Sequence, residues 1–264
     1  MRGLERSRVV DGGALDPGWG TFYKVAGTAA LLVVAVGLLD FVLALLQGDA
    51  KTPGTTSVLD WFLLLQQRTF FGLRNLGVLN IVTITLGVPL YLALFYAHRR
   101  ISAGFAALAV ILFAAGAAVY ISTNAVFSLL ALSGQYAAAA TDSQKALLIS
   151  AGTAILARGE DLTAGTFMGF FLTEIAALLM AGLMLRARVF GRVTALVGIV
   201  GMGLMLIFNI CAAFAPAMYG TAMIISMLGA LPSMAWYILM ARRLFQLGRA
   251  DANAFVPAQS PHAS

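Results

Sequence analysis

The sequence predicts an all-α fold, a polytopic transmembrane bundle of six helices with two extra amphipathic helices in the long extracytoplasmic loops. Hydrophobic residues make up 61% of the 264-residue chain and charged residues 11%, whereas a soluble domain is about 45–50% apolar and about 25% charged. Six apolar runs alternate with segments that carry the basic residues. Because a helix needs about 20 apolar residues to cross a bilayer, we expect these runs to span the membrane.

The apolar runs give the helices in order. They cover about residues 25–46, 76–97, 101–132, 163–185, 193–215 and 218–240. The first run is longer than the roughly 7–15 apolar residues of a signal peptide, so we expect a retained helix. The third run has a helical pattern as far as Leu132, beyond what a bilayer requires. Arg100, Arg186 and Arg242 follow the second, fourth and sixth runs and are expected to end those spans.

Two long connections, 47–74 and 133–162, each contain a shorter amphipathic stretch. Ser57 followed by Asp60 is typical of a helix N-terminus, because a serine side chain caps the backbone N–H groups of the first turn. Thr141 offers a second cap of the same kind. The first stretch mixes aromatic and basic residues, as helices that lie in a membrane interface do. We therefore predict one amphipathic helix in each long loop.

The distribution of basic residues predicts the orientation. Of the 17 Lys and Arg residues, 12 lie at the two ends of the chain (residues 1–24 and 242–264) and in the turns 97–102 and 186–192, and five lie in the two long loops. Loops rich in Lys and Arg stay in the cytoplasm, so both termini are expected there. We predict disordered cytoplasmic tails over 1–22 and 247–264, flanking a transmembrane domain over 23–246.

Composition also argues against several kinds of site. A single cysteine, Cys211, and two histidines leave too few ligands for a disulfide framework, a thiolate metal cluster or a haem site. We therefore expect no metal site, no cofactor and no catalytic set. The net charge of +6 comes from basic residues beside the spans. Because such residues set the orientation of a membrane protein, we do not expect nucleic-acid binding.

Four stretches of the chain carry a resemblance to a known family. They are residues 72–77 (GLRNLG), 131–139 (ALSGQYAAA), 141–148 (TDSQKALL) and 184–192 (MLRARVFGR). Together they resemble the DUF4386 family of bacterial integral membrane proteins, over about residues 25 to 245. The resemblance implies a six-helix protein of the bacterial cell (inner) membrane. Because the function of that family is uncharacterised, the resemblance implies no catalytic residues.

Two acidic residues, Asp40 and Glu174, lie within the predicted spans. A charge at mid-bilayer costs at least ~2.5 kcal/mol, so such residues usually face the interior of a helix bundle. Glu174 precedes Arg186 by 12 residues, which places it about 18 Å from the cytoplasmic edge at ~1.5 Å per residue. Without a cationic partner in the spans, Glu174 is a candidate to donate a proton or hydrogen bond, or to bind a cation. Asp40 has the alternative of reaching the outer interface.

Other polar residues fall at a similar level in the outer half of the bundle. They are Asn80, Tyr120, Asn124, Thr173 and Asn209. Tyr120 and Asn124 are four residues apart and so share one helix face. With the two acids, these residues predict one polar cavity that opens to the extracytoplasmic side and binds a ligand. The alternative is structural, since amides in spans often hydrogen-bond between helices and contribute about 0.6 kcal/mol each.

Three functions remain open at this point. The first is binding or sensing of a small amphiphile, a lipid or a cation in the outward cavity, with membrane lipid as the other partner. The second is a small ion- or proton-coupled transporter that uses Glu174, although transporters usually show internal repeats, which this sequence lacks. The third is a membrane-embedded enzyme with Asp40 and Glu174 as an acid–base pair. Two carboxyls without a nucleophile or metal ligands indicate an enzyme only weakly.

Overall fold

The computed structural model describes residues 18–47, 53–187 and 189–254. Within these ranges the chain is helical and contains no strand. The longest helices are α1 (Gly18–Gln47), α4 (Val78–Thr123), α7 (Ala164–Ala187), α8 (Arg192–Phe214) and α9 (Tyr219–Ala254). Five helical stretches are long and apolar enough to cross a bilayer. The chain is thus an integral, multi-pass membrane protein.

The ends of the bundle differ from the boundaries expected for the tails. Helix α1 begins at Gly18, before the first apolar run, and α9 continues to Ala254, well past Arg242. The parts of the predicted tails over 1–17 and 255–264 lie outside the described residues. Both end helices are therefore longer than the apolar segments that they contain.

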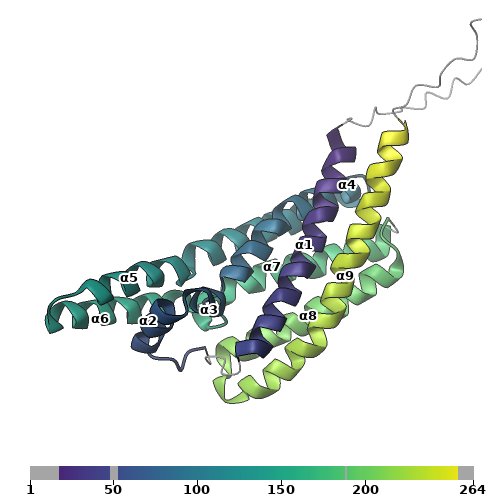
Figure 1. Ribbon diagram of the computed structural model, residues 1–264. Coiled ribbons are helices and arrows are strands. Elements are labelled where there is room, and N and C mark those ends of the chain that lie inside the picture. Colours follow the sequence, from purple (N-terminus) through teal and green to yellow (C-terminus); the bar gives the residue numbers. More distant parts are fainter. Residues whose placement is uncertain (1–17, 48–52, 188, 255–264) are drawn as a thin grey trace, which may run out of the picture.

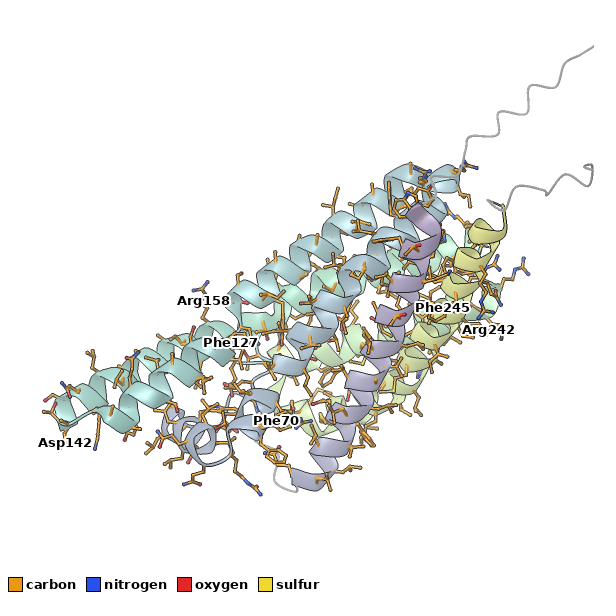
Figure 2. The ribbon with its side chains drawn as sticks, turned by 45° about the horizontal axis from the view of Figure 1, so that its top comes forward. Phe70, Phe127, Asp142, Arg158, Arg242 and Phe245 are labelled. Atoms are coloured by element: carbon orange, nitrogen blue, oxygen red, sulfur yellow. The ribbon has the colours of Figure 1, made fainter. Side chains whose placement is uncertain are left out.

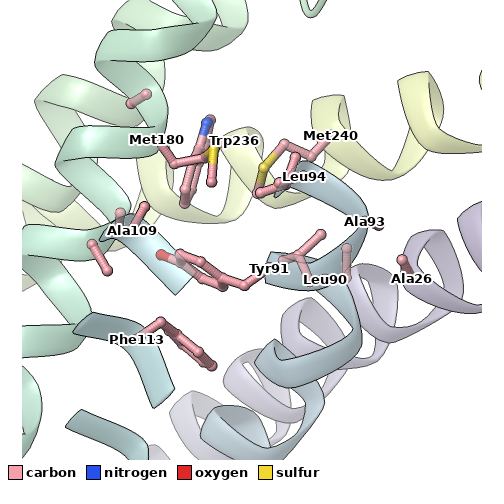
Figure 3. Packing of buried hydrophobic residues seen from close by; sticks show 14 of the residues in the cluster. Ala26, Leu90, Tyr91, Ala93, Leu94, Ala109, Phe113, Met180, Trp236 and Met240 are labelled. Atoms are coloured by element: carbon pink, nitrogen blue, oxygen red, sulfur yellow. The ribbon is translucent and has the colours of Figure 1, made fainter. Parts of the chain in front are cut away.

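Helix α4 is a hairpin of two antiparallel halves. The backbone leaves helical geometry at Ser102 (φ −156°, ψ 79°), directly after the basic residues that end the second apolar run. The two halves then lie against each other, since Tyr91 stacks on Phe113 with ring centroids 3.9 Å apart. Figure 3 shows these two rings face to face. Gly87 allows the close approach, because a Cβ there would lie 2.3 Å from the Phe113 ring.

The long helices form a closed ring of neighbours. Helix α1 packs on α4, α4 on α7, α7 on α8, α8 on α9, and α9 returns to α1 (Figure 1). Their shared core combines many alanines with a few large side chains, among them Tyr91, Met180 and Trp236 (Figure 3). Small residues let membrane helices approach closely, and Gly198 does so against the ring of Trp236. The ring of helices provides the frame for the polar residues considered below.

Four shorter helices form a second body, here called the arm. They are α2 (Val58–Gln67), α3 (Thr69–Asn75), α5 (Val126–Ala138) and α6 (Asp142–Gly159). Helices α5 and α6 project away from α1 and α9 (Figure 1). Helix α2 packs against α5 and α6. The arm has its own apolar core, which includes Trp61, Phe62 and Leu129. Figure 2 places Asp142 at the far tip of the arm and Arg242 at the opposite end of the molecule.

The helix starts in the two long loops agree with the expected caps. Ser57 Oγ accepts a hydrogen bond from the backbone N–H of Asp60 (3.2 Å), and Thr141 Oγ1 accepts one from Gln144 (3.2 Å). The loops nevertheless contain more helix than the single amphipathic segment expected in each, because α3 and part of α5 also lie there. What the loop helices contribute is a packed body with a core of its own.

The expectation of one continuous helix from 101 to 132 is wrong. Helix α4 ends at Thr123 and α5 begins at Val126. The side chain of Asn124 causes the break, because its Oδ1 accepts the backbone N–H of Val126 (2.9 Å) while its Nδ2 donates to the carbonyl of Leu76 (3.0 Å). Asparagine side chains that bond to nearby backbone compete with helical hydrogen bonding. The break separates the bundle from the arm.

Candidate functional site

A cavity of about 360 Å³ lies where α1, α4, α7, α8 and α9 of the bundle meet α3 of the arm. We call it the polar cavity. Its polar wall consists of Asp40, Arg74, Asn75, Asn80, Asp161, Glu174, Asn209, Tyr219 and Ser226. Four residues predicted from the sequence, Asp40, Asn80, Glu174 and Asn209, are therefore brought onto one wall. Arg74 and Asn75 from the arm cover one side of it.

Glu174 is a buried acid of the polar cavity. Its side chain is 7% exposed, and Asn209 Nδ2 donates a hydrogen bond to its Oε1. Its second oxygen, Oε2, is buried and has no hydrogen-bond partner among the described residues. A buried polar atom without a partner is costly, so Oε2 is an acceptor available to a ligand.

Asp161 joins three parts of the chain at the edge of the polar cavity. Tyr120 Oη donates to its Oδ1 (2.7 Å), and Asn80 Nδ2 donates to its Oδ2 (2.8 Å). Asn124 Nδ2 supports the arrangement by donating to Tyr120 Oη (3.2 Å). The side chain is 6% exposed, so the carboxyl is removed from water and held by neutral donors. The bundle, the α6–α7 connection and the start of the arm thus meet at one carboxyl.

Gly77 is the residue that allows this network to close. Its φ is +90°, a conformation that side-chain-bearing residues rarely adopt. A Cβ at this position would lie 2.5 Å from Tyr120 Oη and 2.7 Å from the Asp161 carboxyl. The backbone of Gly77 therefore occupies the space between the start of α4 and the hydrogen bonds of Asp161.

Sequence reasoning did not select Asp161 or Arg74. Asp161 follows Glu160 directly before the fourth apolar run, a position typical of a solvated loop. Arg74 lies in the arm, four residues before Val78, where the bundle helix α4 begins. The sequence did contain a signal that could have selected them. Arg74 and Asp161 each lie directly before an apolar run, at the end of the spans where the predicted polar residues gather.

Asp40 forms an ion pair that the sequence did not predict. Arg74 Nε lies 2.6 Å from Asp40 Oδ1, and Arg74 Nη2 donates to the backbone carbonyl of Asp40 (3.0 Å). Arg74 is 11% exposed and Asp40 45% exposed. The pair connects the C-terminal part of α1 to α3. Asp40 is therefore a structural partner of Arg74, which weakens the reading of Asp40 and Glu174 as an acid–base pair.

The Asp40–Arg74 pair is expected to contribute little to stability, because Asp40 is nearly half exposed. A double-mutant cycle with Asp40→Asn and Arg74→Gln should give a coupling energy of about 1 kcal/mol or less. The measurement is unfolding in detergent micelles at low and high salt, and the coupling should fall as salt rises. A coupling of several kcal/mol that salt does not change would contradict this expectation.

Three predicted site residues do not face the polar cavity. Tyr120 and Asn124 are buried behind its wall, where they hold Asp161. Thr173 donates its hydroxyl to the carbonyls of Phe170 (2.9 Å) and Gly169 (3.2 Å) in its own helix. Its side chain lines a second, neighbouring cavity. These residues support or adjoin the polar cavity without forming its polar wall.

The second cavity has a volume of about 250 Å³ and a mostly apolar wall. We call it the apolar cavity. Val33, Ile84, Phe113, Met202 and Met234 are among its lining residues, together with hydroxyls of Tyr91, Tyr237 and Ser233. The two cavities share Phe170, Glu174, Met205 and Ala230. Glu174 therefore lies at the boundary between a polar and an apolar space.

Comparison with known proteins gives one family. The family described as "Domain of unknown function (DUF4386)" matches residues 63–244, which is more than half of the chain. No curated protein and no solved structure matches the chain. The matched region includes Arg74, Asp161, Glu174 and Asn209, while Asp40 lies before it. The chain therefore belongs to the DUF4386 family, as its sequence motifs suggested.

Proposed function

We propose that this protein binds a small amphiphile in the polar cavity, and that the cavity opens to the extracytoplasmic side of the bacterial inner membrane. One observation carries the proposal. A buried carboxyl, Glu174, has an unpartnered oxygen at the boundary between a polar and an apolar cavity. Ligand pockets combine mostly apolar walls with a few fixed polar groups. A molecule with a polar head and an apolar tail matches both spaces at once.

The proposed topology has six spans, with the two halves of α4 each crossing the bilayer. The turn at Ser102 supports this, since it reverses the chain next to Arg99 and Arg100. Arg242 and the tip of the arm, Asp142, lie at opposite ends of the molecule (Figure 2). The positive-inside rule places the end with Arg242 in the cytoplasm. The arm then lies on the outer side, where α3 covers part of the polar cavity.

The proposal is tested by labelling of an introduced cysteine. Cys211 is the single cysteine of the chain, so Cys211→Ser gives a background without thiols. On that background, Ser226→Cys in the polar cavity should react with a membrane-impermeant thiol reagent added outside intact spheroplasts. Saturating decanol should slow this reaction at least tenfold, because it fills the cavity. Ser128→Cys is the matched control: Ser128 is exposed on α5, and decanol should not change its rate.

Two outcomes would contradict the proposal. Reaction of Ser226→Cys only in inverted vesicles would mean that the cavity opens to the cytoplasm. Reaction from outside at a rate that no amphiphile changes would mean that the cavity is open but binds none. Because Ser128→Cys reports on reagent access alone, either outcome can be separated from poor labelling conditions.

Transport is the second candidate, and the apolar cavity favours it. Its wall includes Tyr91 and Tyr237, which precede Arg99 and Arg242 by eight and five residues. At ~1.5 Å per residue these side chains lie about 12 Å and about 8 Å from the basic end of the bundle. Reaction of Ser233→Cys from inverted vesicles as well as Ser226→Cys from outside would show access from both sides, which alternating transport requires.

A further inference from the structure

We infer that the amphiphile carries a protonated amine as its head group, held by Glu174, with its alkyl tail in the apolar cavity. The inference rests on the proposed function and specifies the ligand of the same site. Four features of the cavities lead to it: the balance of charge, the vacant hydrogen-bond acceptor, the aromatic residues and the division into polar and apolar space.

The balance of charge in the polar cavity favours a cation. Its wall carries the carboxyls of Asp40, Asp161 and Glu174 against the one guanidinium of Arg74. Arg74 is already paired with Asp40 at 2.6 Å. Among the described residues, Asp161 and Glu174 have no ion-pair partner, and neutral side chains donate their hydrogen bonds. Buried acids in membrane proteins usually pair with a cation or line an ion pathway. An anionic head would instead face two unpaired carboxyls.

Hydrogen bonding favours an amine with N–H groups. Glu174 Oε2 is a buried acceptor without a partner. A primary ammonium has three donors and no acceptor. An ammonium head therefore satisfies the vacant Oε2 of Glu174 and adds no acceptor of its own that would need a donor.

Aromatic rings line the same space. Phe170, Phe208 and Tyr219 belong to the wall of the polar cavity. Phe170 is held against the buried ring of Tyr120, with centroids 4.7 Å apart. Aromatic faces attract ammonium groups, and desolvated sites combine such faces with carboxyls to bind amines. A hydroxyl head would gain less from these rings, and a carboxylate would be repelled.

The apolar cavity accounts for the tail. It begins at the residues it shares with the polar cavity, so a head at Glu174 places the adjoining carbons directly at its entrance. Met202, Met205 and Met234 line it. Methionine side chains are flexible and adapt to irregular apolar ligands. The tail thus extends away from the charged wall, between α1, α4, α7 and α9.

The experiment compares three ligands that share one tail. Decylamine, decanol and decanoate compete with radiolabelled decylamine for the protein in nanodiscs of uncharged lipid at pH 7, where an alkylamine is protonated. Decylamine should bind at least about tenfold more tightly than decanol, because hydrogen bonds between charged groups are stronger than neutral ones. Decanoate should bind most weakly. Glu174→Gln should bring decylamine to the level of decanol.

A matched control removes the general effect of charge. Asp142→Asn also removes one acid, but at the exposed start of α6 on the tip of the arm, and it should keep the preference for decylamine. If decanol or decanoate binds as tightly as decylamine, the amine inference is overturned while amphiphile binding stands. If none of the three binds, the proposed function itself fails. If Asp142→Asn abolishes the preference as Glu174→Gln does, the preference arises from surface charge and the inference is again overturned.

Discussion

Asp161→Ala is expected to lower the free energy of unfolding by about 2–3 kcal/mol, because it removes the acceptor of the buried Tyr120 hydroxyl and of the partly buried Asn80 amide. The hydroxyl of Tyr120 and the amide of Asn80 both lose their acceptor, and Tyr120 is fully buried. Leaving a buried polar group without a partner costs about 1–3 kcal/mol. The measurement is equilibrium unfolding in mixed micelles, followed by circular dichroism.

The conservative variant and a surface control sharpen this test. Asp161→Asn keeps one carbonyl acceptor and should lose about half as much stability as Asp161→Ala. Asp142→Ala removes an exposed acid from the first turn of α6, where the effect should stay within about 0.5–1 kcal/mol. If Asp161→Ala is as stable as Asp142→Ala, the Asp161 network does not hold the bundle to the arm.

Gly159→Ala is expected to cost at least about 3 kcal/mol, the upper end of what overpacking usually costs. A Cβ at Gly159 would lie 1.8 Å from the carbonyl oxygen of Thr123 and 3.0 Å from the backbone nitrogen of Ala125. These are backbone atoms and cannot turn aside as a side chain does. The carbonyl of Gly159 also accepts the N–H of Ala125 (2.8 Å), so moving the chain apart breaks that hydrogen bond.

Gly134→Ala provides the comparison for Gly159→Ala in the same part of the molecule. Gly134 lies in α5, and a Cβ there meets no atom within 4 Å. Alanine should leave stability unchanged or raise it by up to ~1 kcal/mol through its better helix propensity. Thermal unfolding of both variants in detergent gives the answer. Equal melting temperatures would show that α6 can shift away from the end of α4 at no cost.

Much of the bundle follows from hydropathy and from counting along helices. Basic residues after apolar runs mark the helix turns, and the same residues serve as depth markers at ~1.5 Å per residue. That count places Asn209 and Glu174 in one half of the bundle, and in the structure they share a hydrogen bond. The caps at Ser57 and Thr141 were also visible, because a cap depends on one side chain and its local backbone.

The remaining features depend on contacts between distant residues. The break at Asn124 was missed because the apolar pattern continues through it, and its cause includes the carbonyl of Leu76, 48 residues earlier. Asp161 resembles an ordinary loop acid until Tyr120 and Asn80 are brought beside it. Arg74 and Asp40 are separated by 34 positions and belong to different helices. No periodicity or composition in one segment contains such information.

The separation of the bundle core from the arm core has a consequence for access to the polar cavity. One core lies in the bundle and the other in the arm, and partly buried Ile81 packs against both. Proteins open locally in units that follow their separate cores, each with its own opening free energy. The arm can therefore loosen while the bundle stays folded. Because α3 belongs to the arm and lines the polar cavity with Arg74, local opening of the arm is expected to expose the polar cavity to the surroundings.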